Sequence, residues 1–376
     1  MQYLDSQSAF DRFAATLRGA PLLAIDTEAA SFHRYRDRVY LVQLSTRTDT
    51  AVVDPLAVPD LSALGHLMAD PAVEVLFHDA DYDLRILDRD YGFHAAHLFD
   101  TRVAAQLLNE PGIGLAALLD KYLSVKIDKK FQRADWSVRP LLPGMLEYAA
   151  NDTRYLPTLR DIMQRKLEEM GRWSWAEEEF GLIEKMRWNV TGPAEEAYLR
   201  IKGARTLRGH QLAVLRELFA LREQIASEQD RAPFRVLMNE AMLAIAKAMP
   251  TDANALRDLK ALSPDQQRRR GEEILAAVAR GAAAPRESLP VFERGKRTAP
   301  DLAYEARLER MKTERNALAE RIGLAPGVLC PNGHLESVAR LEPKSVEQLT
   351  EIPEMRRWQR EVAGEVLLRA SLGKTG

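Results

Sequence analysis

The chain has little cysteine and no long apolar run, and each shortage excludes a class of protein. Cys330 is the only cysteine in 376 residues. It cannot form an internal disulfide and cannot anchor a zinc site alone. A transmembrane helix is excluded because no run of about 18 apolar residues is present. The first residues lack the basic start and apolar core of a signal peptide. We therefore expect a cytoplasmic protein that does not bind membranes.

Charge is distributed unevenly between the two halves of the chain. Residues 1–195 carry 22 Lys and Arg against 30 Asp and Glu, a balance of −8. Residues 196–376 carry 31 against 25, a balance of +6. This asymmetry favours a division of labour around a shared polyanion, although ordinary helix surfaces also vary in charge. The length itself predicts two or three domains.

The first half has the pattern of an α/β domain. Strand-like stretches lie at 22–28, 38–46, 51–55 and 73–80, and helical spacing lies at 61–70, 81–92, 98–109 and 114–123. The first two strands are joined by a short polar segment, which predicts antiparallel neighbours. Strands followed by strand–helix alternation indicate a mixed sheet covered by helices.

The second half has no strand-like alternation after about residue 190 and contains a weak repeat. The repeat aligns Val236 and Leu237 with Val328 and Leu329 at an offset of 92 residues, across a linker rich in Ala, Pro and Gly. Two copies of one small helical domain are the simplest explanation. The run 266–273 (QQRRRGEE) has the charge of a nucleic-acid-binding patch, but a solvated helix face would have the same pattern.

Two carboxylates end the first apolar strand of the α/β half. Asp26 and Glu28 in PLLAIDTE are two residues apart, so on a strand they point to the same side. Unpaired, they would repel each other and resist burial. A divalent cation removes this conflict, and hard oxygen ligands suit Mg²⁺ or Mn²⁺. A solvated strand end gives the same local pattern, so further acids are needed.

Further acids follow at two places. Asp83 begins a helical pattern just after a buried strand, while helix capping or first-turn charge explains Asp79 and Asp81. Tyr148 and Asp152 are four apart in EYAANDTRYL, which places them on one face of a helix. Each element alone is common, but the ordered set is rare.

This set resembles the DEDDy superfamily of 3′→5′ exonucleases. The segments DTRVAAQLL, KYLSVKIDKKFQRADWSVRPL and EYAANDTRYLPTL are similar to the ribonuclease D family. The second half resembles the paired HRDC domains that follow the nuclease in that family and also occur in RecQ-type helicases. The implied fold is an α/β ribonuclease H-like (DnaQ-like) exonuclease domain followed by two small all-helical HRDC-like domains.

The resemblance also implies domain limits. The expected domains are the exonuclease at 1–195, a first HRDC-like domain at 204–283, a linker at 284–299 and a second, divergent HRDC-like domain at 300–372. The protein is expected to be a monomer.

The resemblance implies a two-metal site. Carried over residue by residue, its ligands are Asp26, Glu28, Asp83 and Asp152, holding two Mg²⁺ or Mn²⁺ ions. We expect Asp26 to bridge both ions, Glu28 and Asp152 to complete the tighter site, and Asp83 to serve the second ion mostly through water. Tyr148 would orient the attacking water, because an ordinary pKa of about 10 makes a tyrosine a poor base.

Weaker candidates for contacts with substrate lie around these motifs. Phe32 could stack on a base, and His78 could reach the terminal nucleotide. For both residues a packing role in the core is equally plausible. Gln43 could touch the 3′ end. Phosphate or sugar contacts are predicted for Lys129, Gln132 and Arg133. Trp136 and Cys330 are predicted to be structural.

The sequence thus predicts a metal-dependent 3′→5′ exoribonuclease that releases 5′-mononucleotides. By resemblance, its RNA partners would be the 3′ trailers of tRNA precursors and other small structured RNAs. Two alternatives remain open at this point. One is a DNA exonuclease of the Werner or proofreading type, and the other is a non-catalytic RNA-binding protein on the same fold.

Overall fold

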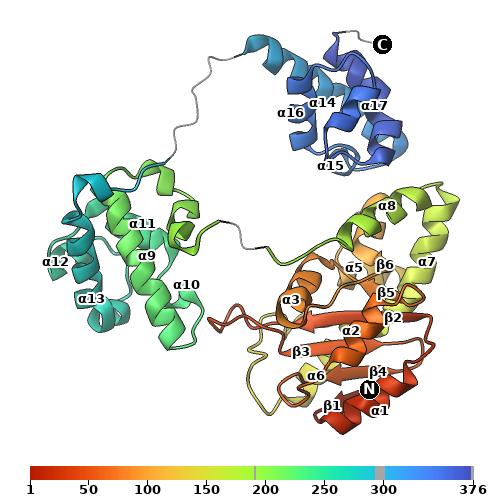
Figure 1. The fold of residues 1–376 in the computed structure, drawn as a ribbon, viewed down its shortest axis with the longest axis horizontal. Coiled ribbons are helices and arrows are strands. Elements are labelled where there is room, and N and C mark those ends of the chain that lie inside the picture. Colours follow the sequence, from red (N-terminus) through yellow and green to blue (C-terminus); the bar gives the residue numbers. More distant parts are fainter. Residues whose placement is uncertain (190–191, 293–300, 374–376) are drawn as a thin grey trace. The chain divides into compact units, whose positions relative to one another are not determined.

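The computed structural model describes residues 1–189, 192–292 and 301–373 (Figure 1). Contacts divide the chain into two compact units. The first unit comprises Met1–Glu28, Val39–Trp188 and Thr298–Gly376, and the second comprises Ala29–Arg38 and Asn189–Arg297. In the part of the chain so described, no helix combines the length and apolarity needed to cross a bilayer.

A six-stranded mixed sheet lies at the centre of the first unit. Its strands are β1 (Gln2–Leu4), β2 (Leu22–Glu28), β3 (Leu41–Ser45), β4 (Thr50–Val53), β5 (Glu74–Phe77) and β6 (Leu98–Asp100). The order across the sheet is β1-β4-β3-β2-β5-β6. Strand β3 runs antiparallel to both of its neighbours, and every other pairing is parallel. The predicted mixed sheet and its antiparallel first pair are confirmed.

Helices surround this sheet. Those of the nuclease region are α1 (Gln7–Thr16), α2 (Ser62–Ala69), α3 (Asp81–Tyr91), α4 (Thr101–Leu107), α5 (Leu115–Leu123), α6 (Pro143–Arg154), α7 (Leu156–Glu169) and α8 (Trp173–Ile183). Helix α6 packs on β2, β3 and β4, and α7 packs on β2 and β5. Because β2 and β3 are covered in this way, nearly all of their side chains are buried.

Two local details differ from the sequence-based expectation. The stretch 98–109 is not one helix, since Leu98–Asp100 forms edge strand β6 before α4 begins. A proline can kink a helix, so Pro157 was a candidate to kink the helix that contains Tyr148, but that helix ends at Arg154. Helix α7 then begins with Pro157 in its first turn. A proline is tolerated there because the backbone nitrogens of the first turn make no hydrogen bond within the helix.

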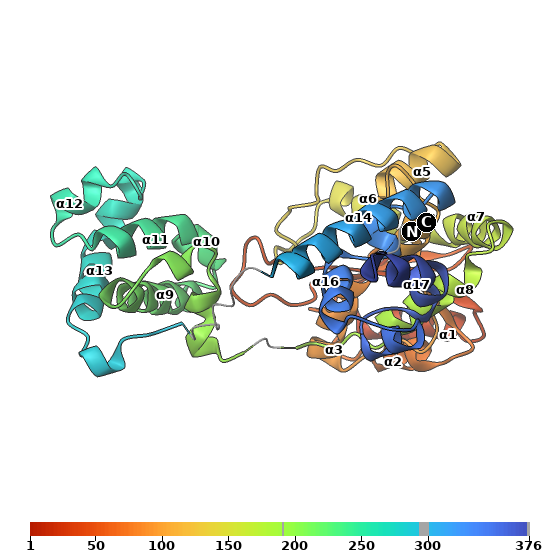
Figure 2. The same ribbon diagram turned by 90° about the horizontal axis from the view of Figure 1, so that it is seen from above.

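The second unit contains a helical bundle, which stays together in both views of Figures 1 and 2. Its elements are η1 (Ala194–Arg200), η2 (Ala204–Thr206), α9 (His210–Glu228), α10 (Pro233–Val236), α11 (Asn239–Ala248), α12 (Ala253–Asp258), α13 (Pro264–Ala282) and η3 (Arg286–Ser288). Helices α9 and α13 pack closely, because Gly281 lies directly against the backbone of Val214. A side chain at Gly281 would separate the two helices.

A second helical set repeats this arrangement, and the structure corrects its register. The elements are α14 (Leu302–Ile322), α15 (Pro326–Leu329), α16 (Asn332–Leu341), η4 (Glu347–Glu351) and α17 (Arg357–Ser371). Both ends of α10 and α15, and both ends of α11 and α16, are 93 residues apart. The offset of 92 was wrong because it matched similar leucines and valines across the boundary of a short helix.

The two helical sets share a buried arginine–asparagine contact. Arg222 on α9 donates to Asn239 Oδ1 at 2.7 Å, and Arg315 on α14 donates to Asn332 Oδ1 at 3.1 Å. Both arginines are less than a tenth exposed. A buried guanidinium needs such partners, so this contact fixes the short helix between the two longer ones in each set. We call it the Arg–Asn latch.

The later helical set packs on the nuclease region within the first unit. The rings of Trp175 on α8 and Trp358 on α17 stack with centroids 4.7 Å apart. Glu178 accepts hydrogen bonds from the backbone nitrogens of Arg357 and Trp358, at 2.6 and 3.0 Å. These nitrogens belong to the first turn of α17 and have no partner inside the helix. A carboxylate on α8 therefore caps α17.

Candidate active site

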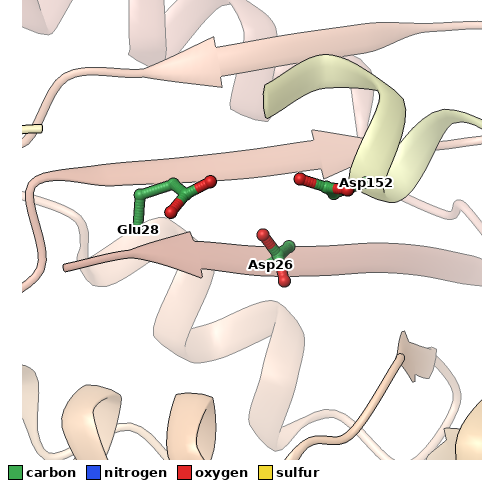
Figure 3. A group of neighbouring side chains, drawn as sticks. All are labelled: Asp26, Glu28 and Asp152. Carbon is green, nitrogen blue, oxygen red and sulfur yellow. The ribbon is translucent and has the colours of Figure 1, made fainter. Parts of the chain in front are cut away.

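Three carboxylates converge at the sheet. Asp26 and Glu28 project from β2 to the same side, and Asp152 projects toward them from α6 (Figure 3). One oxygen of each lies within 4.8 Å of the others. We call Asp26, Glu28 and Asp152 the carboxylate triad. All three remain partly exposed, so an ion and a substrate can reach them.

Helix α6 is held firmly over the strands that carry these acids. Ala149 and Ala150 are fully buried, and their small side chains let the helix approach the sheet. The hydroxyls of Ser45 on β3 and Thr153 on α6 lie 2.8 Å apart and share a hydrogen bond. Because Thr153 follows Asp152 directly, this bond also fixes the position of Asp152.

Asp83 lies beside the triad but is held by another contact. Its Oδ1 accepts hydrogen bonds from the backbone nitrogen of Thr27, at 3.1 Å, and from the Thr27 hydroxyl. Thr27 separates Asp26 from Glu28 along β2. Asp83 is therefore fixed to the strand of the triad without belonging to it.

Burial makes this cluster of acids electrostatically costly in the absence of a cation. Desolvation raises the pKa of Asp83 and the pKa of Asp152 to about 7. The pKa values of Asp26 and Glu28 also lie well above the usual range, first because of desolvation and then because of the neighbouring carboxylates. Such a cluster fits divalent cations, which favour the charged form of every member.

These pKa values predict a pH-dependent response to metal. A carboxyl whose pKa is raised in the fold binds more protons folded than unfolded, so it lowers stability as pH rises from about 4 to about 7. We expect the metal-free protein to lose thermal stability over this range. The increase in Tm on adding Mg²⁺ should grow over the same range, because protons then compete less. Thermal melts in EDTA and in Mg²⁺ at intervals across this pH range test this, and an equal Mg²⁺ effect at every pH would contradict it.

Tyr148 projects from α6 one turn before Asp152 and is enclosed by two aromatic rings. The rings of Phe131 and Trp136 each lie 6.1 Å from that of Tyr148. Burial, followed by the charges of Asp152 and Glu28, raises the pKa of Tyr148 above its usual value. The hydroxyl therefore stays protonated at neutral pH and can orient a water but cannot act as a base.

A cavity of about 340 Å³ opens beside Tyr148 and Asp152. Its wall is formed by α6 and the segment that precedes it, and its lining residues are Ile127, Asp128, Lys130, Phe131, Gly144, Glu147, Tyr148, Asn151 and Asp152. Sequence reasoning named Lys129 in this segment, whereas Lys130 lines the cavity. In a segment without regular secondary structure, the sequence does not show which side chains face the same way. No signal in the sequence therefore indicated that Lys130, and not Lys129, faces the cavity.

The weaker candidates lie in different places. Lys129, Gln132 and Arg133 are exposed on the segment between α5 and α6. Phe32 belongs to the second unit, where its ring meets that of Phe234 edge-on at 6.3 Å. Gln43 lies on β3 directly opposite Asp26. The structure does not test a role in substrate binding for any of these residues, so they remain predictions.

His78 has a defined hydrogen bond at the end of β5. Its Nδ1 lies 2.9 Å from the Thr101 hydroxyl, which itself donates to the carbonyl of Phe77. Nδ1 must therefore carry the proton. Burial lowers the pKa of His78 to about 4, so the ring is neutral at physiological pH. A contact of His78 with the terminal nucleotide remains a prediction.

Asp100 supports the site and was missed by sequence reasoning. Its carboxylate accepts hydrogen bonds from the backbone nitrogens of Asp79 and Ala80, at 3.2 and 2.8 Å, and it also caps α4. The turn held in this way begins α3, which carries Asp83. An Asp just before a helix was the available signal, but the stretch had been assigned to the helix itself.

Cys330 is fully buried in the later helical set. Burial raises the pKa of its thiol to about 12, so the thiol is not a nucleophile.

Comparison with known proteins identifies the family. The sequence model of a family described as 3′-5′ exonuclease matches residues 1–168, and the HRDC domain model matches 211–278 and 305–370. A ribonuclease D of Shewanella sp. (strain ANA-3) is 30% identical over 371 residues, covering 98% of this chain and 93% of that protein. The chain belongs to the ribonuclease D family. A ribonuclease D of Gluconacetobacter diazotrophicus is 32% identical, covering 95% and 89% of the two chains.

A solved structure agrees with this membership. The crystal structure of Escherichia coli RNase D, described as an exoribonuclease involved in structured RNA processing, matches with a TM-score of 0.73 and 26% identity. The match covers 100% of this chain and 99% of the other. The chain is thus a 3′→5′ exoribonuclease with a ribonuclease H-like nuclease domain followed by HRDC domains. Membership of the ribonuclease D family does not favour a DNA exonuclease or a non-catalytic RNA-binding protein.

Proposed function

We propose that this ribonuclease D family member hydrolyses RNA from its 3′ end and releases 5′-mononucleotides, using two divalent ions held by Asp26, Glu28, Asp83 and Asp152. The observation that carries the proposal is the convergence of the carboxylate triad, with oxygens within 4.8 Å of one another. Thr27 fixes Asp83 beside the triad, where it would help to hold a second ion, mostly through water.

The residues of the site have distinct roles in this proposal. Two bound divalent ions supply charge stabilisation for the attacking and leaving oxygens of an in-line displacement at phosphorus. Asp26 would help to hold both ions, and Glu28 and Asp152 would complete the tighter site. The Tyr148 hydroxyl hydrogen-bonds the attacking water and orients it. The cavity beside Tyr148 receives the terminal nucleotide, and Lys130 offers a positive charge to its phosphate.

End-labelled RNA tests the reaction. Protein incubated with 3′-labelled RNA and Mg²⁺ should release labelled mononucleotide at once, whereas 5′-labelled RNA should shorten one nucleotide at a time. EDTA should stop both. Release of dinucleotides or longer fragments would contradict the proposal. The same sequence offered as DNA should be degraded more slowly. Equal rates on RNA and DNA would support the alternative function, a DNA exonuclease.

We propose the 3′ trailers of tRNA precursors and other small structured RNAs as substrates, in the cytoplasm. The basic second half supports a role in holding the folded part of such RNAs. Arg268 and Arg269 on α13 are strongly exposed, and each forms an ion pair with Asp265. Exposed pairs of this kind are weak, so a phosphate can displace the aspartate.

Replacing Arg268 and Arg269 by alanine should weaken binding of a tRNA precursor. Each lost phosphate contact should reduce the slope of log affinity against log salt by about 1. Hydrolysis of a short single strand should be unchanged, because it needs only the active site. The matched control is Arg357→Ala, an exposed arginine paired with Glu361 in the later helical set. If the double variant loses activity equally on the tRNA precursor and on the short single strand, α13 does not hold the RNA.

A further inference from the structure

Gln43 has a buried carboxamide without a partner. The residue is fully buried on β3, and neither its Oε1 nor its Nε2 has a hydrogen-bond partner among the residues that the structure describes. Buried side-chain amides are nearly always paired, because an unpaired one has lost the hydrogen bonds that it makes to water in the unfolded chain. An orphaned amide of this kind indicates a missing partner that is not part of the described chain.

The pairing of the strands directs this amide to the carboxylate triad. Gln43 and Asp26 are directly opposite in the antiparallel β2–β3 pair, so their side chains lie on the same face of the sheet. Ser45, two residues along β3, shares that face and bonds to Thr153 on α6. Gln43 therefore lies on the face of the sheet that is covered by α6, the helix that carries Asp152. On its other side Gln43 pairs with Val52, which offers no polar group.

We propose that Gln43 is a positioning residue whose carboxamide hydrogen-bonds the hydration water of a divalent ion held at the carboxylate triad. The inference rests on the metal site of the proposed function and adds Gln43 to the residues that position that site. An amide suits this role because it can both accept from a water and donate to a neighbouring oxygen without adding charge. Residues that orient the ligands of a metal in this way typically change metal affinity by ~10–100-fold when replaced.

The test is Mn²⁺ binding, measured by calorimetry without RNA, in the full chain. Gln43→Met keeps the volume of the side chain and removes both polar atoms. We expect its Mn²⁺ affinity to fall by ~10–100-fold. Its Tm in EDTA should equal or exceed that of the wild type, since an unpaired buried amide is removed. Gln43→Leu serves the same purpose should the Met variant not fold.

A second buried glutamine provides the matched control. Gln359 in the later helical set donates to the carbonyl of Val328 at 3.0 Å and accepts from the backbone nitrogen of Arg356 at 3.0 Å. Gln359→Met should lower the Tm in EDTA and leave Mn²⁺ affinity unchanged. The contrast between the two variants separates a role at the metal from a role in packing.

Three results would overturn the inference. One is wild-type Mn²⁺ affinity in Gln43→Met, and another is a fall in its metal-free Tm as large as that of Gln359→Met. In either case the proposed function survives, provided that Asp26→Asn abolishes Mn²⁺ binding. The third is a wild-type protein that binds no Mn²⁺, which would overturn the proposed function as well.

Discussion

Asp26→Asn is expected to remove nearly all nuclease activity while leaving the fold and RNA binding in place. Asp26 is central to the carboxylate triad, and Asn lacks the charge that a divalent ion requires. Replacing a residue that only supports a metal ligand typically lowers metal affinity or activity by ~10–100-fold. Replacing a ligand itself should therefore lower kcat/KM by more than ~10³-fold. RNA binding should persist, because phosphate contacts elsewhere provide most of it. Asp152→Asn should behave alike.

The metal-free stability of Asp26→Asn distinguishes a lost ligand from a damaged fold. Burial and three neighbouring carboxylates make the Asp26 charge unfavourable without metal. Its removal should therefore leave the Tm in EDTA unchanged or higher. The matched control is Asp81→Asn on α3, an exposed acid paired with Arg85 at 3.0 Å, which should retain wild-type activity. Full activity of Asp26→Asn at physiological Mg²⁺ would refute the site.

Tyr148→Phe is expected to lower kcat by ~10²-fold or more, with little change in metal or RNA affinity. Phenylalanine keeps the ring between Phe131 and Trp136 and removes only the hydroxyl. Because the raised pKa of Tyr148 keeps that hydroxyl protonated, its contribution is the orientation of water. The effect should therefore appear in turnover and not in binding.

Single-turnover kinetics with excess enzyme provides the measurement for Tyr148→Phe. It isolates the chemical step from product release, which could otherwise hide the effect. Tyr155→Phe, just beyond the end of α6, is the control and should behave as wild type. Unchanged single-turnover rates in Tyr148→Phe would leave the tyrosine with a packing role only.

The sequence predicted the regular parts of the fold because their signals are local. Strand β2 was found with correct bounds, since an apolar run ending in carboxylates is unambiguous. Strand β6 was missed because three residues, Leu98–Asp100, give no periodicity and merge with the pattern of α4. The repeat offset was wrong by one residue for a similar reason, since leucines match in either register.

The candidate site was predictable to the extent that it depends on residue type and spacing. Asp26, Glu28 and Asp152 were named before the structure brought them together. What surrounds a side chain could not be deduced in this way. Gln43 has no hydrogen-bond partner because of how β2, β4 and α6 pack around it, which its own sequence neighbours do not reveal. Asp100 supports the site through a turn that lies 20 residues earlier in the chain.

The Arg–Asn latch separates what the two helical sets share from what differs between them. At the 93-residue offset both sets have the latch, yet Glu361 and Val362 stand where the first set has Arg268 and Arg269. The earlier set exposes these two arginines, whereas the later set packs on the nuclease region through Trp358. Since neither feature takes part in the latch, the outward-facing residues of one set should be transferable to the other by a few substitutions.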